Sequence, residues 1–267
     1  MTPPQVLALL SDPRVRLCAG TVALLCTALA AHGNRVGAGE ARTFRAINEL
    51  PDALYPPGWI VMQLGNLGAV PAAAGAAWLA GDRELAGRLL TVGSVTWLLA
   101  KGVKYVIRRD RPGSLLPDTL GRGPDASGLG YLSGHAGVAF ALGAAALPRL
   151  SRPGRVLVLG AIPTVAVTRV YVGAHLPLDI VGGAALGVAV EAGLAMLTTR
   201  RRHAKRPRTP LAGAQLAAGR QPTACRRRAA RTRSTPTTPS PVSEARRAGC
   251  LLEGFPSLVI VSPGFRS

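Results

Sequence analysis

The residues of this chain best suited to chemistry are two histidines and a nearby aspartate. His175 and Asp179 lie four residues apart, so they share a face if both lie in the first turn of a helix. A carboxylate on one imidazole nitrogen fixes the tautomer and raises the basicity of the other nitrogen. This pattern makes His175 a candidate nucleophile. The alternative is a structural His–Asp pair that only caps a helix.

A second motif, Ser133-Gly134-His135, precedes an apolar segment. Ser133 suits the N-cap of a helix, and Gly134 lets a ligand approach the backbone closely. The free N–H groups and the dipole of such a helix start attract an anion. His135 would stand beside that anion and could pass it a proton. Taken alone, the motif also fits an ordinary helix start with a polar histidine.

A third cluster supplies positive charge at spacings that put four cations on one face of a helix. These cations are Lys101, Lys104, Arg108 and Arg111. Pro112 then discourages the helix from continuing. Arginine offers phosphate a planar fork and lysine a point charge, although a helix end with long side chains reaching for water is an equally good reading. Arg169 would join His175 only across a bend, which Gly173 permits.

These motifs lie at the ends of long apolar segments. The chain has 267 residues, 48% of them hydrophobic, and a bilayer core needs about 20 apolar residues per helix. Six segments approach this length: 15–31, 58–80, 87–107, 134–147, 156–171 and 178–199. We therefore predict an all-α fold, a six-helix transmembrane bundle within residues 1–199. The first segment resembles a secretory signal, but we expect a retained helix because further spans follow.

The positive charge of the chain is concentrated after the last apolar segment. Of the net charge of +19, residues 200–267 carry +13. We expect this segment to be a disordered, basic cytoplasmic tail that touches anionic lipids, and we expect no nucleic-acid binding because no binding module is present. Short basic loops on the same side predict cytoplasmic termini in a multi-pass protein of the plasma membrane. The three chemical clusters then face away from the cytoplasm.

Together the three clusters resemble the signature of the type 2 phosphatidic acid phosphatase (lipid phosphate phosphatase) family, over roughly Phe44 to Leu194. That signature is Lys-x6-Arg-Pro, then Pro-Ser-Gly-His, then Ser-Arg-x5-His-x3-Asp. The matching segments are Lys104 to Pro112, Leu132 to His135, and Thr168 to Asp179. Leu132 stands where the family usually has Pro, and Thr168 where it has Ser. Neither departure removes a reacting group.

The resemblance implies a role for each matching residue. The phosphate oxygens would be held by Lys104, Arg111, Ser133, Gly134 and Arg169. His175 would attack phosphorus, His135 would protonate the leaving oxygen, and Asp179 would orient His175. Fixed cations would stabilise the charge, so neither a metal nor another cofactor is expected. The expected activity is metal-independent hydrolysis of a lipid phosphate or polyprenyl diphosphate through a phospho-histidine.

Other functions fit parts of the same pattern. A lipid phosphotransferase would use the same histidine and pass the phosphate to an alcohol. A lipid-binding or transport protein without turnover would give a role to Glu191, an acid within the last apolar segment. A metal hydrolase would use His135, His175 and Asp179 as ligands. The natural substrate and the oligomeric state stay open at this level.

Overall fold

The structure, a computed structural model, describes residues 11–123 and 128–205. Within these residues every regular element is helical, so the predicted all-α class is confirmed there. The principal helices are α2 (Pro13–Ala31), α3 (Ala38–Asn48), α4 (Tyr55–Met62), α5 (Ala69–Leu79), α6 (Arg83–Ile107), α7 (Pro112–Leu115), α8 (Gly134–Ala146), α9 (Arg152–Tyr171) and α10 (Pro177–Lys205). Helix α10 thus extends past the predicted end at residue 199. The rest of the predicted tail lies outside the described residues.

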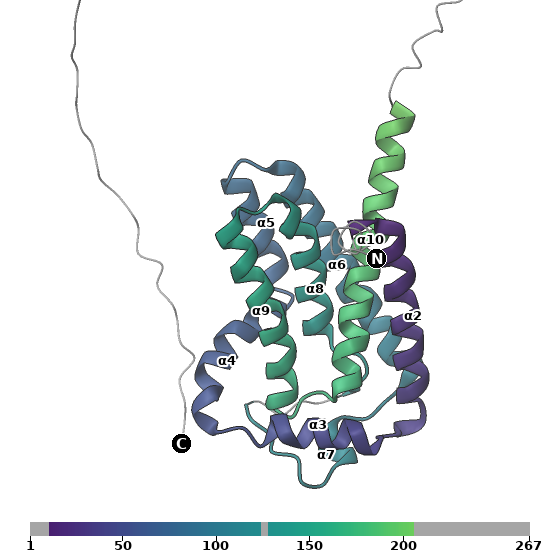
Figure 1. The fold of residues 1–267 in the computed structure, drawn as a ribbon, viewed down its shortest axis with the longest axis vertical. Helices are drawn as coiled ribbons and strands as arrows, with labels where there is room; N and C mark the ends of the chain where they lie inside the picture. Colours follow the sequence, from purple (N-terminus) through teal and green to yellow (C-terminus); the bar gives the residue numbers. More distant parts are fainter. Residues whose placement is uncertain (1–10, 124–127, 206–267) are drawn as a thin grey trace, which may run out of the picture. The chain divides into compact units, whose positions relative to one another are not determined.

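The long helices pack side by side around α8 and α10 (Figure 1). Helix α10 packs against α2 and α8, α6 packs against α5 and α8, and α9 contacts α8 and α4. Small residues permit this close approach: a side chain at Gly183 or Gly187 of α10 would collide with the backbone of α8 at Ser133 or Gly137. This packing brings the start of α8 against the start of α10.

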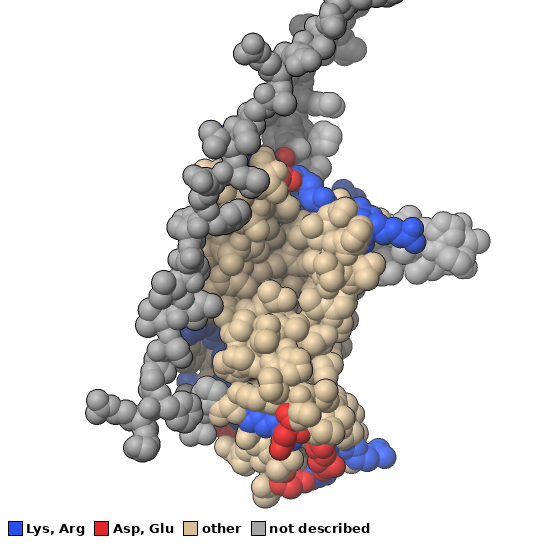
Figure 2. All heavy atoms as spheres, turned by 90° about the vertical axis from the view of Figure 1, so that its left-hand side faces the viewer, with Lys and Arg blue, Asp and Glu red and all other residues tan. Residues whose placement is uncertain are grey.

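Several helices have the length and composition of membrane spans. By these two measures α2 with its following turn, α9 and α10 qualify, and the bent pair α4–α5 gives a fourth span if it is counted as one. Figure 2 shows a broad face free of charged side chains between two charged ends. The chain is therefore an integral membrane protein. Six spans are not confirmed, since α6 carries several charges and α8, with 13 residues, reaches only about 20 Å.

The predicted span 58–80 is not one helix. Helix α4 ends at Met62, a 3-10 turn covers Gln63–Gly65, and α5 starts at Ala69, with a bend of 73° across the break. The side chain of Asn66 accepts a hydrogen bond from the backbone N–H of Ala69 at 2.8 Å and donates one to Gln63 at 2.9 Å. Asn66 thus satisfies backbone and side-chain groups in the turn, and it stabilises the break that the hydropathy pattern concealed.

Ion pairs mark the end of the bundle far from the three motifs. Glu191 of α10 is buried and pairs with Arg16 of α2, at 2.6 Å, and with Arg88 of α6. Arg149, which follows α8, pairs with Asp82 at the start of α6. Glu191, which the sequence presented as an acid among apolar residues, therefore ties three helices together.

The opposite end gathers short elements around the starts of α8 and α10. Helix α3 lies crosswise there, and α7 lies beside it (Figure 1). Helix α3 contacts both α9 and α10. None of the six predicted segments covers residues 32–57, so α3 is a helix that was not predicted. Its amphipathic pattern spans only 11 residues, and its buried side chains Ala41, Phe44 and Asn48 face the end of the bundle.

Candidate active site

A cavity of about 290 Å³ unites the three motifs at this end of the bundle. Six of the eight predicted site residues line it: Lys104, Arg111, Gly134, His135, Arg169 and His175. The remaining two are adjacent, because Ser133 precedes Gly134 and a carboxylate oxygen of Asp179 lies 3.6 Å from His175 Nδ1. Side chains from α6, α8, α9 and the segments before α7 and α10 thus meet at one point. A single phosphate group could contact both histidines and several cations there.

His175 lies just before α10, so of the pair only Asp179 is in the first turn of that helix. Helix α10 begins at Pro177, and the backbone N–H of His175 donates to the carbonyl of Arg169 at 3.2 Å. Gly173 has φ +73° and makes the predicted bend between α9 and α10. The bend, by returning the chain toward Arg169, places His175 beside the arginine that precedes it by six residues.

Asp179 lies in the first turn of α10 and is fully buried. One of its oxygens accepts the backbone N–H of Leu176 at 2.8 Å, and the other accepts from Arg109 at 2.8 Å. Its separation of 3.6 Å from His175 Nδ1 exceeds hydrogen-bond length. Within the described residues His175 Nδ1 has no hydrogen-bond partner. The carboxylate therefore caps the start of α10 and also faces the ring of His175.

The predicted stripe of four cations on one helix is wrong. Helix α6 ends at Ile107 because Arg108 adopts a left-handed conformation, φ 53°. Arg111 follows in the next turn as the N-cap of α7. Only Lys101 and Lys104 lie on α6, and both line the cavity. Arg111 reaches the cavity from a different direction, so the phosphate site is surrounded on more sides than a single helix face allows.

Backbone carbonyls hold two of the four cations that line the cavity. Lys104 Nζ donates to the carbonyl oxygens of Leu129 and Gly130 at 2.9 and 3.1 Å. Arg111 donates to the carbonyl of Gly128 at 3.1 Å and to that of Ala174 at 3.0 Å. These bonds leave both cations without a carboxylate partner among the residues that the structure describes. Their positive charge is thus available to an anion.

Arg169, the third cation, comes from the last turn of α9. Its Nη1 lies 3.3 Å from Met62 Sδ, a weak acceptor, and its buried Nε has no hydrogen-bond partner in the described part of the chain. Buried polar groups in proteins are nearly always paired, and exceptions often mark functional sites. Arg169 therefore has donor capacity that an anion in the cavity would satisfy.

The start of α8 has the predicted N-cap. The Ser133 hydroxyl accepts the backbone N–H of Ala136 at 3.4 Å, and the backbone N–H of Ser133 donates to the carbonyl of Asp179 at 2.9 Å. The second bond joins the second motif to the third. Gly134, the first residue of the helix, lines the cavity, so the positive end of the helix dipole faces the cations and histidines.

The environment of His175 favours its neutral form. Burial, followed by the positive charges of Arg169, Lys104 and Arg111, lowers the pKa of His175 well below its usual range. A neutral imidazole is the nucleophilic form. The same cations that would bind phosphate thus keep this ring unprotonated.

The site opens into a second, more polar cavity of about 660 Å³. Arg111, His135 and Arg169 line both cavities. The larger one continues past Trp59 and the segments around Ser114 and Arg122. The smaller one is bordered by the break between α4 and α5 and by Trp97, whose ring lies under Lys101 Nζ at 4.7 Å. The two cavities therefore meet at His135, Arg111 and Arg169.

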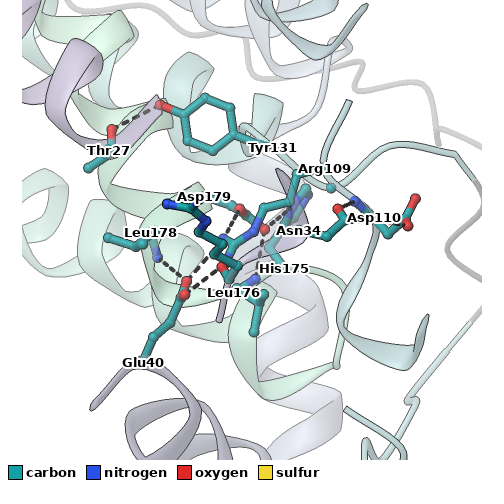
Figure 3. A network of polar contacts seen from close by, with 12 residues as sticks. Thr27, Asn34, Glu40, Arg109, Asp110, Tyr131, His175, Leu176, Leu178 and Asp179 are labelled. Atoms are coloured by element: carbon teal, nitrogen blue, oxygen red, sulfur yellow. Dashed lines mark hydrogen bonds and ion pairs between the residues drawn. The ribbon is translucent and has the colours of Figure 1, made fainter. Parts of the chain in front are cut away.

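A buried ion-pair network that the sequence did not predict lies behind Asp179 (Figure 3). Arg109 is fully buried and pairs with Asp179 at 2.8 Å and with Glu40 of α3 at 2.7 Å. In the sequence Arg109 is one of several neighbouring charges between residues 108 and 111, and Glu40 lies far upstream. No local pattern separates these two residues from solvated surface charges, so only the fold identifies them.

The described residues contain no group of three or more His, Cys, Asp or Glu side chains placed to hold a metal ion. His135, His175 and Asp179, which the metal-hydrolase alternative requires, do not form such a group there. The cations that face both histidines are instead lysine and arginine side chains.

Comparisons with known proteins give one family match and two structures of similar fold. The sequence profile of the PAP2 superfamily matches residues 85–203, which hold all three motifs. No curated protein matches the chain. Two solved structures share the fold, each with a TM-score of 0.56.

One of these structures is described as the first transmembrane PAP2 type phosphatidylglycerolphosphate phosphatase from Bacillus subtilis. It is 21% identical, and the alignment covers 72% of this chain and 99% of that one. The other is Aquifex aeolicus LpxE, 20% identical, with 62% of this chain and 99% of that one covered. Residues 85–203, with the three motifs within them, are thus similar to the PAP2 superfamily.

Proposed function

We propose that this protein is a lipid phosphatase that hydrolyses a lipid phosphate or polyprenyl diphosphate through a phospho-histidine at His175. The observation that carries the proposal is the cavity in which two histidines face Lys104, Arg111 and Arg169. The match of residues 85–203 to the PAP2 superfamily and the phosphatase described for the Bacillus subtilis neighbour support the same reaction class. The apolar helices around the site support a substrate whose non-phosphate part is lipid.

In the first step, Nε2 of neutral His175 attacks phosphorus. Burial and then the charges of Arg169, Lys104 and Arg111 lower the pKa of His135 to about 4 in the free site, and a bound phosphate offsets those charges so that His135 takes up a proton. The bond from phosphorus to the bridging oxygen of the lipid breaks, and His135 donates this proton to that oxygen as it leaves. Asp179, facing Nδ1, stabilises the positive charge that develops on the ring of His175. Lys104, Arg111 and Arg169, placed before the reaction begins, stabilise the transferring phosphoryl group.

In the second step, His135, now neutral, takes a proton from water. The resulting hydroxide attacks phosphorus, the bond to His175 Nε2 breaks, and inorganic phosphate leaves. These steps need no metal ion, because fixed cations supply the charge stabilisation. Transfer to an alcohol instead of water would make the protein a phosphotransferase. The wide polar cavity beside the histidines favours water as the acceptor.

The proposed setting is the plasma membrane, with the site on the extracytoplasmic side and both termini in the cytoplasm. The end of the bundle that holds Arg16, Arg88 and Arg149 is rich in arginine. Short basic segments favour the cytoplasmic side. The site lies at the opposite end of the same helices, and it would meet lipids of the outer leaflet. The proposed substrate is then a lipid phosphate of the same membrane in which the protein lies.

The first prediction tests the nucleophile. His175→Ala should lower phosphate release from dioctanoyl phosphatidic acid by at least about three orders of magnitude, because the covalent step is lost. The assay uses purified protein in detergent with EDTA present throughout. A labelled phosphoenzyme, stable to base and labile to acid, should form in the wild type and be absent in the variant.

His32→Ala is the matched control, since His32 is exposed and lies in a turn apart from the cavity. It should leave the rate unchanged. Full activity of His175→Ala would remove the nucleophile assignment, whereas loss of wild-type activity on adding EDTA would favour a metal hydrolase. A panel that includes phosphatidylglycerol phosphate and a polyprenyl diphosphate would then define the substrate class.

A further inference from the structure

The cation that pairs with Asp179 does not line the cavity. Arg109 is buried behind Asp179, and its guanidinium contacts two carboxylates and a backbone carbonyl (Figure 3). Its Nη1 donates to Asp179 at 2.8 Å, and its Nη2 donates to Glu40 at 2.7 Å and to the carbonyl of Arg35 at 2.7 Å. Its buried Nε has no hydrogen-bond partner in the described residues, but Arg109 does not line the cavity and so is not placed to bind a substrate.

Glu40 holds this arginine from α3. Its two oxygens accept from the two terminal nitrogens of Arg109, at 3.0 and 2.7 Å, in the fork geometry that gives a carboxylate–arginine pair its directionality. One of the same oxygens accepts the backbone N–H of Leu178 at 3.1 Å. Glu40 therefore touches both the arginine behind Asp179 and the first turn of α10. Glu40 lies outside the segment 85–203 that defines the family match.

A neighbouring contact strengthens the same junction. The side chain of Asn34 donates to the carboxylate of Asp110 at 2.7 Å and accepts the backbone N–H of Asp110 at 2.8 Å. The segment from Asn34 to Glu40 thus binds the turn between α6 and α7 at two adjacent residues, Arg109 and Asp110. This segment fixes where Arg109 stands.

We propose that Glu40 and Arg109 are positioning residues for the reaction at His175. Glu40 anchors Arg109, and Arg109 holds the carboxylate of Asp179 in the place from which it orients the His175 ring. The chain of contacts runs from Glu40 to Arg109 at 2.7 Å, to Asp179 at 2.8 Å, and to His175 Nδ1 at 3.6 Å. The inference rests on the proposed function, because it assigns a purpose to residues behind the proposed nucleophile.

Glu40 also sets how much negative charge Asp179 offers to His175. Arg109 is shared between two carboxylates, so its positive charge neutralises only part of the negative charge of Asp179. Without the charge of Glu40, all of it would fall on Asp179 and weaken the support that Asp179 gives to a positive imidazole. The other charged or titratable groups around His175 are Lys104, Arg111, His135 and Arg169.

The test is Glu40→Gln, compared with Glu49→Gln, an exposed glutamate at the end of the same helix. Phosphate release from dioctanoyl phosphatidic acid gives kcat and KM. Glu40→Gln should lower kcat by about 10- to 100-fold, as the loss of an outer orienting partner does elsewhere, with KM changed less than about two-fold. The acid limb of its kcat/KM profile should move to lower pH, since a negative charge near His175 is gone. Glu49→Gln should match the wild type.

Glu40→Asp keeps the charge and should recover part of the lost kcat and return the acid limb toward its wild-type position. Wild-type kcat and pH profile in Glu40→Gln would overturn the inference. So would an equal loss in both Glu40 variants with an unmoved profile, which would assign Glu40 to packing alone. A rise in KM with unchanged kcat would overturn it too, by placing Glu40 in substrate binding.

Thermal unfolding in detergent would reveal a folding defect in Glu40→Gln. Arg109→Lys is a second variant that tests the same contact if that defect is found. Lysine keeps the charge but loses the fork, so kcat should fall with KM unchanged. Wild-type kinetics in Arg109→Lys would overturn the inference. The wild type and His175→Ala are assayed in parallel. A wild type without phosphate release contradicts the proposed function itself, whereas an active wild type with an unaltered Glu40→Gln contradicts only the positioning role.

Discussion

At the scale of single residues, His175 shows how one set of charges serves two needs. Arg169, Lys104 and Arg111 would attract a phosphate dianion, and they also oppose protonation of the ring. Burial acts in the same direction and is the larger cause. An arriving phosphate would neutralise part of this positive field. The proposed nucleophile is therefore neutral before a substrate binds, and the charges that keep it neutral would also bind the phosphate.

A pH prediction follows from the lowered pKa of His175. Because protonation destroys the nucleophile, activity should persist as pH falls through about 6.5, the ordinary pKa of histidine, and decline only below it. The measurement is kcat/KM against pH, corrected for the second ionisation of the substrate phosphate, which is determined separately by titration. An acid limb centred at or above 6.5 would contradict the assignment of this ring as the neutral nucleophile.

At the scale of elements, the sequence predicted the ends of the long helices well and their interruptions poorly. Hydropathy locates α2, α6, α8, α9 and α10 because polar or charged residues bound each apolar run. The break after Met62 escaped notice, since Gln63 and Asn66 are only two polar residues within a long apolar run. Helix α3 was missed for another reason: its partners α9 and α10 are distant in sequence. Glu40 and Arg109 became recognisable only once α3 was placed.

The broken helix should position His135. A Cβ at Gly65 would lie 2.6 Å from the carbonyl oxygen of His135 and 2.8 Å from Val165 Cγ1, so the turn packs directly on α8 and α9. Gly65→Ala should displace His135, lower kcat by about ten-fold or more, and lower stability by about 1–3 kcal/mol through overpacking. Gly75→Ala on α5 is the control, because open space surrounds that position. Kinetics and thermal unfolding report the two effects, and equal behaviour of both variants would dismiss the role of the turn.

At the scale of the whole membrane-embedded part, the two ends of the bundle have different tasks. One end is held by Glu191 with Arg16 and Arg88, which join α10 to α2 and α6. The other end is held by Arg109, which joins the α6–α7 turn to α3 and α10. Long-range ion pairs of this kind are invisible to hydropathy analysis. They explain why the sequence predicted where the motifs lie on the chain but not how they are supported.

The proposed topology can be tested with single cysteines. Ser114→Cys lies at the wide cavity and Ser151→Cys at the start of α9, beyond the opposite end of the bundle; both serines are exposed. With the four native cysteines replaced by serine, a membrane-impermeant maleimide should label the first variant in intact cells and the second only after permeabilisation. The reverse pattern would turn the site toward the cytoplasm and contradict the proposed location.

The interruption between α4 and α5 has one more consequence. Irregular backbone among membrane helices is tolerated where protein buries it or where water reaches it. Gly65, Asn66 and Leu67 form part of the wall of the smaller cavity, next to His135 and His175. We expect water to enter the smaller cavity along this wall from the larger, more polar cavity. The break between the two helices would then provide the route by which water reaches the histidines for hydrolysis.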